Sequence, residues 1–186
     1  MPAFNPYRIL DDSNLVEMLA RYSISNKQLY LVTHFNHPRE LTEAAIEGLT
    51  RIIDAGVICV NQTPILAGIN DSPSTLGTLF AKLSYLGVPP YYVFQNRPTR
   101  GNKVFRVPIV RGWYLFQLAL GQVSGLARRA RFTMSHHTGK LEIVGVNRDY
   151  IYMRYHLLPG LSGFAMEINP SFSIFEQNFS EETSTF

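Results

Sequence analysis

The order of strand-like and helix-like segments is the feature of this sequence that most restricts its fold. Residues 29–33, 57–60 and 90–94 are short apolar runs rich in β-branched and aromatic residues, as buried strands are. Between them, residues 41–53 and 72–86 carry apolar residues at helical spacing, and a third such segment covers 109–123. Strand–helix–strand repeats with continuously apolar strands predict a parallel sheet that is buried on both faces.

Capping residues support the helix boundaries. The first of these helices is predicted to open after Asn36-His37-Pro38 and to stop at Gly56. Ser72-Pro73 supplies a cap and an N1 proline for the next helix, which Gly87 ends. Near the start of the chain, Asp12-Ser13-Asn14 can cap a helix that runs to about Tyr22.

The pattern changes near Ser124. Residues 131–134 are strand-like, and the runs 141–144 and 150–153 flank Asn147-Arg148-Asp149, which is a hairpin signature. The sequence therefore predicts an α/β fold with parallel strands, followed by a small β-hairpin extension. We expect three regions: a barrel-like part over 1–123, a hairpin segment over 124–175 and a polar tail over 176–186.

Length, charge and hydropathy exclude several classes of protein. The chain has 186 residues, which suits one domain, and a formal net charge of +3. It has no apolar run of about 18 residues and no secretory signal at its start, so we expect no membrane partner and a cytoplasmic location. Arg128, Arg129 and Arg131 form one tight basic group, which is too small a face for nucleic acid. Cys59 lies in a strand-like run and is interpreted as a core residue.

Polar residues follow each predicted parallel strand. His34-Phe35-Asn36 follows the first strand, Asn61-Gln62 the second and Gln95-Asn96-Arg97 the third. Functional groups of (β/α) barrels lie just beyond the carboxyl ends of the strands. Polar residues are also ordinary in loops, so each group alone favours that plainer interpretation. Three groups at equivalent positions favour a site.

These strand ends also carry a resemblance. The stretch from Thr33 to Thr42 resembles a signature of the lysine 2,3-aminomutase family. Four further stretches resemble that family in the same order and at matching spacing: Val60-Asn61-Gln62-Thr63, Gly68-Ile69-Asn70-Asp71, Pro90-Tyr91-Tyr92-Val93-Phe94-Gln95 and Ser124-Gly125-Leu126-Ala127. The resemblance extends from about residue 1 to 160 and implies the C-terminal half of a partial (β/α) barrel.

The resemblance implies both a chemistry and its residues. Members of the family are radical enzymes in which a 4Fe–4S cluster cleaves S-adenosylmethionine and pyridoxal phosphate carries the migrating amino group. His34 and Gln62 match residues that contact S-adenosylmethionine, and the adjacent Asn61 is assigned to the cofactor-binding group with them. Lys140 matches the catalytic lysine that forms the Schiff base with pyridoxal phosphate. Without the resemblance, Lys140 is simply a solvent-facing lysine before a strand.

A metal site is not predicted. His136 and His137 are adjacent, and adjacent side chains on a strand point in opposite directions. An iron–sulfur cluster needs several thiolates, and Cys59 is the single cysteine of the chain. The family's C-x-x-x-C-x-x-C loop is therefore missing, and by the resemblance it would lie N-terminal to Met1. Residues 1–8 resemble the end of an internal strand and loop of the family.

Other departures from the family pattern concern the substrate. Lysine mutases bind the distal ammonium of lysine with aspartates, but Arg97 stands at one such position and Thr133 or Met134 lies near the other. Arg97 can pair bidentately with a carboxylate, which favours an acidic amino-acid substrate such as glutamate. It can equally grip a phosphate or a neighbouring loop. Ala67 replaces a common arginine, and Asn96 replaces the usual cysteine.

Three hypotheses follow. The chain is part of a split or truncated aminomutase whose missing half lies on a separate chain, or it is a non-catalytic remnant or scaffold of the same family. The third hypothesis is a nucleic-acid or membrane-surface binder that uses the arginine group. Half a barrel leaves strand edges unpaired, so we also expect a homo-oligomer or poor solubility for the isolated chain.

Overall fold

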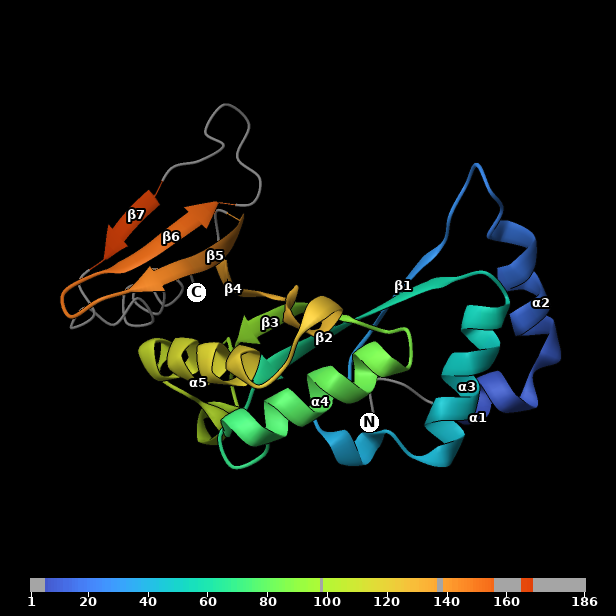
Figure 1. Cartoon of the computed structure of the whole chain (residues 1–186), viewed down its shortest axis with the longest axis horizontal. Helices are drawn as coiled ribbons and strands as arrows, with labels where there is room; N and C mark the ends of the chain where they lie inside the picture. The colour runs from blue at the N-terminus through green and yellow to red at the C-terminus, as the bar shows by residue number, and fades with distance from the viewer. Residues whose placement is uncertain (1–5, 98, 137–138, 156–164, 169–186) are drawn as a thin grey trace.

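The computed structural model describes residues 6–97, 99–136, 139–155 and 165–168. One seven-stranded sheet with strand order β1 to β7 runs through these residues (Figure 1). The strands are β1 (Tyr30–Thr33), β2 (Ile58–Ile65), β3 (Pro90–Gln95), β4 (Arg131–His136), β5 (Gly139–Val146), β6 (Ile151–Tyr155) and β7 (Ala165–Ile168). The helices are α1 (Pro6–Asp11), α2 (Ser13–Tyr22), α3 (Glu43–Asp54), α4 (Pro73–Tyr85) and α5 (Ile109–Gly121).

Strands β1 to β4 are parallel and lie side by side in chain order. Helices α3, α4 and α5 connect them, one between each successive pair of strands. This is the arrangement of part of a (β/α) barrel, as the sequence predicted. The cap of α4 is also as predicted, because the Ser72 side chain accepts a hydrogen bond from Thr75 N at 3.1 Å and Pro73 is the first helical residue.

Strands β5, β6 and β7 continue the same sheet in antiparallel order. The predicted hairpin is confirmed as β5 and β6, which Asn147-Arg148-Asp149 joins. The pairing of β3 with β4 joins the segments that were predicted as residues 1–123 and 124–175 into one sheet. The tail over 176–186 lies outside the described residues.

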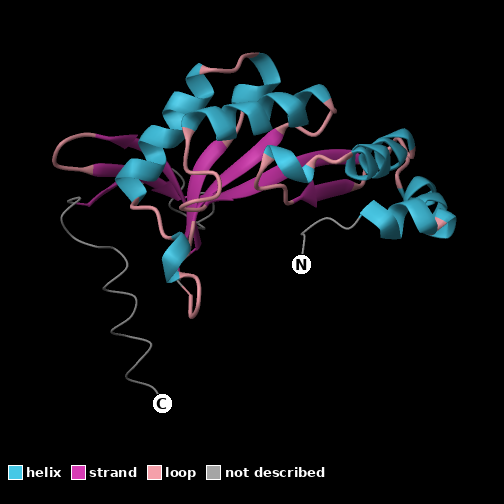
Figure 2. Cartoon of the chain, turned by 90° about the horizontal axis from the view of Figure 1, so that it is seen from below, coloured by secondary structure: helices cyan, strands magenta, loops and turns pink. Residues whose placement is uncertain are grey.

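Helices α4 and α5 lie over one face of the sheet, and α1, α2 and α3 gather at the β1 end (Figure 1 and Figure 2). Two apolar cores fill the space between sheet and helices, one around Phe80 and Phe132 and one around Leu49 and Leu83. The opposite face is open, because Tyr30 is 65% exposed and Ile58 is 40% exposed there. The expectation of a sheet buried on both faces is therefore wrong for these residues. Right-handed crossovers between strands in chain order place every connecting helix on the same side.

Several boundaries differ from the predicted ones. Strand β2 continues to Ile65, so Asn61 and Gln62 lie inside the strand and not beyond its end. A 3₁₀ turn, Pro38–Glu40, precedes α3, which begins only after the Thr42 cap. Helix α1 (Pro6–Asp11) includes residues 6–8, for which the end of a strand and a loop were expected. Strand β7 was not predicted. Within the described ranges, no helix is long and apolar enough to cross a bilayer.

Candidate functional site

Lys140 lies on the open face of the sheet, near the start of β5. Its Nζ is 3.9 Å from the ring centre of Tyr92 and 5.1 Å from that of Phe94, both on β3. Strand β4 lies between β3 and β5, and neighbouring strands are about 4.8 Å apart, so the lysine stem crosses β4. Thr133 of β4, which pairs with Phe94 and is 0% exposed, lies on the same face. The aromatic rings therefore hold the amine over the middle of the sheet.

Charged residues of β4, β5 and β6 share the open face with this amine. Glu142 follows two positions after Lys140 on the same face of β5, and its Oε2 accepts a hydrogen bond from Arg154 Nη2 at 2.8 Å. The same oxygen is 3.9 Å from Nη1 of Arg131. Arg131 pairs with Tyr92 and Arg154 pairs with Glu142, so register puts all of these side chains on the open face.

Tyr92 keeps its proton over the whole physiological range. The pKa of Tyr92 is raised to about 12, mainly by burial and also by a hydrogen bond with Tyr91 and the nearby Glu142 carboxylate, whereas Arg131 acts in the opposite direction. The phenol is therefore neutral where Lys140 contacts it. A neutral ring presents its negative face to an ammonium without adding a charge of its own.

Gln62 shares the open face with Lys140. It pairs with Tyr92 across β2 and β3, just after a register shift between Asn61 and Gln62. Within the part of the chain that the structure describes, no hydrogen bond engages its amide. Gln62 is thus available to a ligand that lies over β2 and β3.

Asn61 points to the helix-covered face and is 1% exposed. Its Oδ1 accepts hydrogen bonds from Phe35 N at 2.8 Å and from Thr33 Oγ1 at 3.0 Å. Its Nδ2 donates to Phe35 O at 3.1 Å and to Thr63 Oγ1 at 2.9 Å. The amide therefore fixes the backbone that follows β1, and the sheet separates it from Lys140.

His34 lies in the segment that Asn61 fixes, directly after β1. Burial lowers the pKa of His34 below its usual value near 6.5, and the Glu40 carboxylate acts in the opposite direction. Among the described residues, the buried Nε2 of His34 has no hydrogen-bond partner. Glu40 Oε1 accepts hydrogen bonds from Asn36 N at 3.0 Å and from His37 N at 2.9 Å, which fixes the backbone of the loop directly after His34.

Arg97 begins the loop after β3, and its side chain is exposed. Asn102 shapes this loop, since its Nδ2 donates to Arg97 O at 2.8 Å and its Oδ1 accepts from Thr99 N at 2.8 Å. Arg97 is three positions after Phe94, a span of at most about 11 Å of extended chain. Asn96, which stands where the family has cysteine, is 9% exposed and donates to Phe105 O at 3.5 Å.

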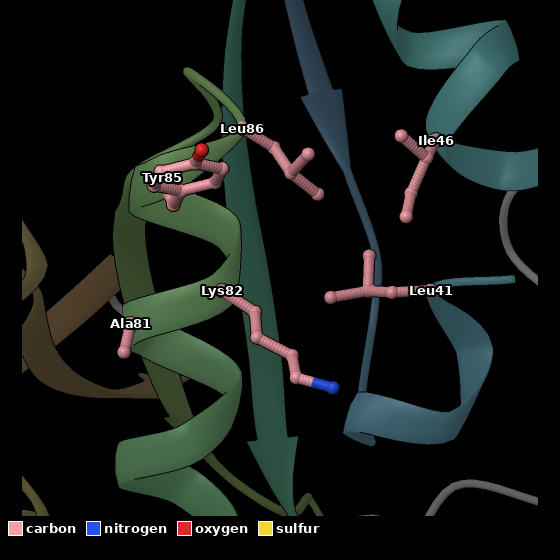
Figure 3. A pocket seen from close by; sticks show the side chains of 6 residues that line it. All are labelled: Leu41, Ile46, Ala81, Lys82, Tyr85 and Leu86. Carbon is pink, nitrogen blue, oxygen red and sulfur yellow. The ribbon is translucent and has the colours of Figure 1, made fainter. Parts of the chain in front are cut away.

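A groove lies elsewhere, between α3 and α4 (Figure 3). It has a volume of about 510 Å³ and is lined by Leu41, Ile46, Ala81, Lys82, Tyr85 and Leu86. These side chains come from the helix layer, so the sheet separates the groove from Lys140. None of the predicted site residues lines it.

The structure thus brings together only some of the predicted residues. Lys140 and Gln62 share the open face, Asn61 lies on the other face, and His34 and Arg97 lie in loops beyond strand ends. Residue-by-residue reasoning missed Tyr92, Arg131, Glu142 and Arg154 as neighbours of Lys140. The alternation of side chains along β4 and β6 could have indicated which residues share a face with Lys140. That inference also requires the register between the strands, which the sequence does not give. His137 lies outside the described residues.

The residues present differ in how well they fit the two cofactor types. Cys59 is 2% exposed, and burial raises the pKa of its thiol to about 11, so it is a core residue and no cluster ligand. Within the described ranges, no group of three or more His, Cys, Asp or Glu side chains is placed to hold a metal ion. Pyridoxal phosphate fits better, because an amine and two guanidinium groups share one accessible face.

The chain was compared with known proteins. No protein-family model matches the chain. An Aquifex aeolicus protein that has been assigned as an L-lysine 2,3-aminomutase is 50% identical over 157 residues. These residues cover 84% of this chain and 42% of the relative. The glutamate 2,3-aminomutase of Clostridioides difficile is 34% identical over 122 residues, which cover 66% of this chain and 28% of that enzyme.

A solved structure was also found. A radical SAM methyltransferase from Sphaerobacter thermophilus superimposes with a TM-score of 0.48 and 17% identity, over 65% of this chain and 38% of that one. The L-lysine 2,3-aminomutase of Methanococcus maripaludis is 35% identical over 127 residues, or 28% of its length. The chain therefore spans less than half the length of these curated relatives. It belongs to the lysine 2,3-aminomutase family and corresponds to the C-terminal part of its members.

Proposed function

We propose that this chain is the pyridoxal phosphate-binding part of a radical S-adenosylmethionine 2,3-aminomutase, with Lys140 as the cofactor lysine. The observation that carries the proposal is the position of Lys140, whose amine lies over Tyr92 on the open face of the sheet. The Lys140 amine would hold pyridoxal phosphate covalently through the aldehyde of the cofactor. When bound there, pyridoxal phosphate carries the migrating amino group of the substrate.

The chain's own residues divide the remaining work. Gln62 faces the same side as Lys140 and can hydrogen-bond a ligand over β2 and β3. The buried Nε2 of His34, which has no hydrogen-bond partner among the described residues, supports a contact with S-adenosylmethionine at the end of β1. Asn61 belongs with this group as the residue that holds the His34 segment in place. The cluster ligands come from another polypeptide or another part of a longer protein.

An acidic amino acid is the proposed substrate. Arg97 carries a positive charge at a position where lysine mutases use an aspartate, and like charges repel. A guanidinium in the loop after β3 instead suits the side-chain carboxylate of glutamate. A glutamate 2,3-aminomutase, at 34% identity, is among the relatives, beside lysine 2,3-aminomutases at 35% and 50%.

The open face and the β1 edge require a partner. Tyr30 is 65% exposed and Val32 is 45% exposed, and β1 has no neighbour on its outer side among the described strands. An edge strand with apolar side chains is a site of association. We expect this surface to pair with the cluster-bearing half or, in its absence, with a second copy of the chain.

A chimeric enzyme tests the function. In the glutamate 2,3-aminomutase of Clostridioides difficile, the part that matches this chain is replaced by the sequence of this chain. The chimera should move the amino group of glutamate, and Lys140→Ala should abolish migration while S-adenosylmethionine cleavage continues. Lys82→Ala, in the remote groove, is the matched control and should retain migration.

Two outcomes oppose parts of the proposal. A folded chimera that cleaves S-adenosylmethionine but moves the amino group of neither glutamate nor lysine contradicts the enzymatic role and favours the alternative of a non-catalytic remnant or scaffold. The lack of cluster ligands and the changes at Ala67 and Asn96 are the observations behind that alternative. If the chimera moves the amino group of lysine and not that of glutamate, only the proposal that Arg97 binds an acidic substrate is contradicted.

A further inference from the structure

The open face of β3 to β6 carries more positive than negative charge. Arg131, Lys140 and Arg154 are its cations, and Glu142 is its one carboxylate among the described residues of these four strands. Of the four residues of this ionic group, only Lys140 was predicted from the sequence to belong to a cofactor site. The group spans β4, β5 and β6, so three different strands hold it in place.

Glu142 arranges the two arginines without neutralising them. Its side chain is only 13% exposed, and one oxygen, Oε2, serves both guanidinium groups. The contact with Arg131 at 3.9 Å is an ion pair beyond hydrogen-bond distance, whereas the contact with Arg154 at 2.8 Å is a hydrogen bond. The arginine side chains remain 53% and 50% exposed, so about half of each side chain is still accessible from solvent.

The arginines lie within reach of a ligand attached to Lys140. Arg131 pairs with Tyr92, the residue on whose ring the lysine amine lies. One strand spacing, about 4.8 Å, separates these two positions, and an arginine side chain is longer than that. A ligand that starts at the amine and ends in an anion thus has a guanidinium on the adjacent strand.

We propose that Arg131 and Arg154 bind the phosphate of the pyridoxal phosphate that is attached to Lys140, with Glu142 holding both guanidinium groups in position. The inference rests on the proposed function and adds the residues that recognise the phosphate. Guanidinium groups bind phosphate oxygens bidentately, and a dianion matches two cations.

A purely structural cross-strand ion group is the competing explanation. Such a group joins neighbouring strands and is indifferent to ligands, and exposed pairs of this kind contribute little to stability. The two explanations differ in one respect. Only the phosphate site makes the arginines discriminate between pyridoxal phosphate and pyridoxal, which lacks the phosphate.

The test is a titration of the full chain with each of these two aldehydes. Imine formation is followed by visible absorption, and the reduced adduct is located by peptide mapping. The wild-type chain should bind pyridoxal phosphate at least about tenfold more tightly than pyridoxal, and Arg131→Gln and Arg154→Gln should each lower this ratio at least about threefold. Pyridoxal binding itself should not change, which also shows that the variants fold.

Arg148→Gln is the matched control, because Arg148 lies in the turn between β5 and β6, outside the ionic group, and should leave the ratio unchanged. Adducts on Lys140 with an unchanged ratio in both arginine variants overturn the phosphate site but leave the proposed function intact. No adduct on Lys140 with either aldehyde overturns both. If Arg148→Gln lowers the preference for pyridoxal phosphate over pyridoxal as much as Arg131→Gln and Arg154→Gln do, the inference is also overturned. The net charge of the chain would then explain the preference.

Discussion

The amine of Lys140 lies 3.9 Å from the ring centre of Tyr92, although a complete strand, β4, separates their two strands. The contact determines where a ligand on this lysine has to lie, over β3 and β4 on the open face. Gln62 and Arg131, which both pair with Tyr92, and Glu142 share this face with the amine.

A double-mutant cycle measures this contact. Tyr92→Leu removes the ring, Lys140→Met removes the charge and keeps the stem, and the double variant closes the cycle. Cation–π pairs contribute about 0.5–2 kcal/mol, so we expect a coupling free energy in that range from urea unfolding. Tyr92→Phe keeps the ring face and should preserve the coupling. Additive single effects would contradict the contact.

Asn61 and Gln62 are neighbours in β2 with opposite roles, which makes them a matched pair. Asn61→Ala removes four hydrogen bonds, two of them to the main chain of Phe35, and should lower the free energy of unfolding by about 2–4 kcal/mol. Gln62→Ala, on the open face, should change it by less than about 0.5 kcal/mol. Equal losses in chemical denaturation would show that the two faces have been assigned wrongly.

Helix α5 approaches the sheet at a glycine. A Cβ on Gly112 would lie 3.0 Å from both Gln95 Oε1 and the ring of Phe132, whereas one on Gly121 would meet nothing within 4 Å. Gly112→Ala should therefore destabilise the chain by about 1–3 kcal/mol through overpacking. Gly121→Ala in the same helix should be neutral or slightly stabilising, because alanine has the higher helix propensity. Thermal unfolding of both variants checks the close approach of α5 to β3 and β4.

His34 makes stability depend on pH. Because the pKa of His34 is lower in the folded chain than its usual value near 6.5, the unfolded chain takes up the proton first as the pH falls. The stabilising contribution is therefore complete above about pH 6.5 and is lost below it. His34→Gln should remove this part of the slope. The check is the difference in unfolding free energy between pH 7.5 and pH 5.5, which should be smaller in the variant, and an equal slope in both proteins would contradict the buried position.

Much of the parallel half could be predicted, because its strands and helices carry local signals. The strand 57–60 was followed by polar residues that are typical of a loop, yet Asn61 continues β2, since its amide finds four partners in the buried interior. Local hydropathy cannot indicate such long-range hydrogen bonding. The open face could have been predicted from strands in chain order, because their crossovers all lie on one side.

The candidate site was harder to predict than the fold. Lys140 was predicted only by resemblance, and its neighbours depend on the register of β3, β4 and β5, which places Thr133 opposite Glu142 and Tyr92 opposite Arg131. Turn geometry and packing set that register, and the sequence of a single strand does not contain it.

Chemical trapping tests the central claim, that Lys140 is the cofactor lysine, most directly. The chain is mixed with pyridoxal phosphate, reduced with borohydride and digested, and the label is located by mass spectrometry. The account predicts labelling of Lys140 at concentrations that leave Lys27, Lys82 and Lys103 unmodified, and loss of this label in Lys140→Arg. Equal labelling of all four lysines, or label on the others and none on Lys140, would contradict it.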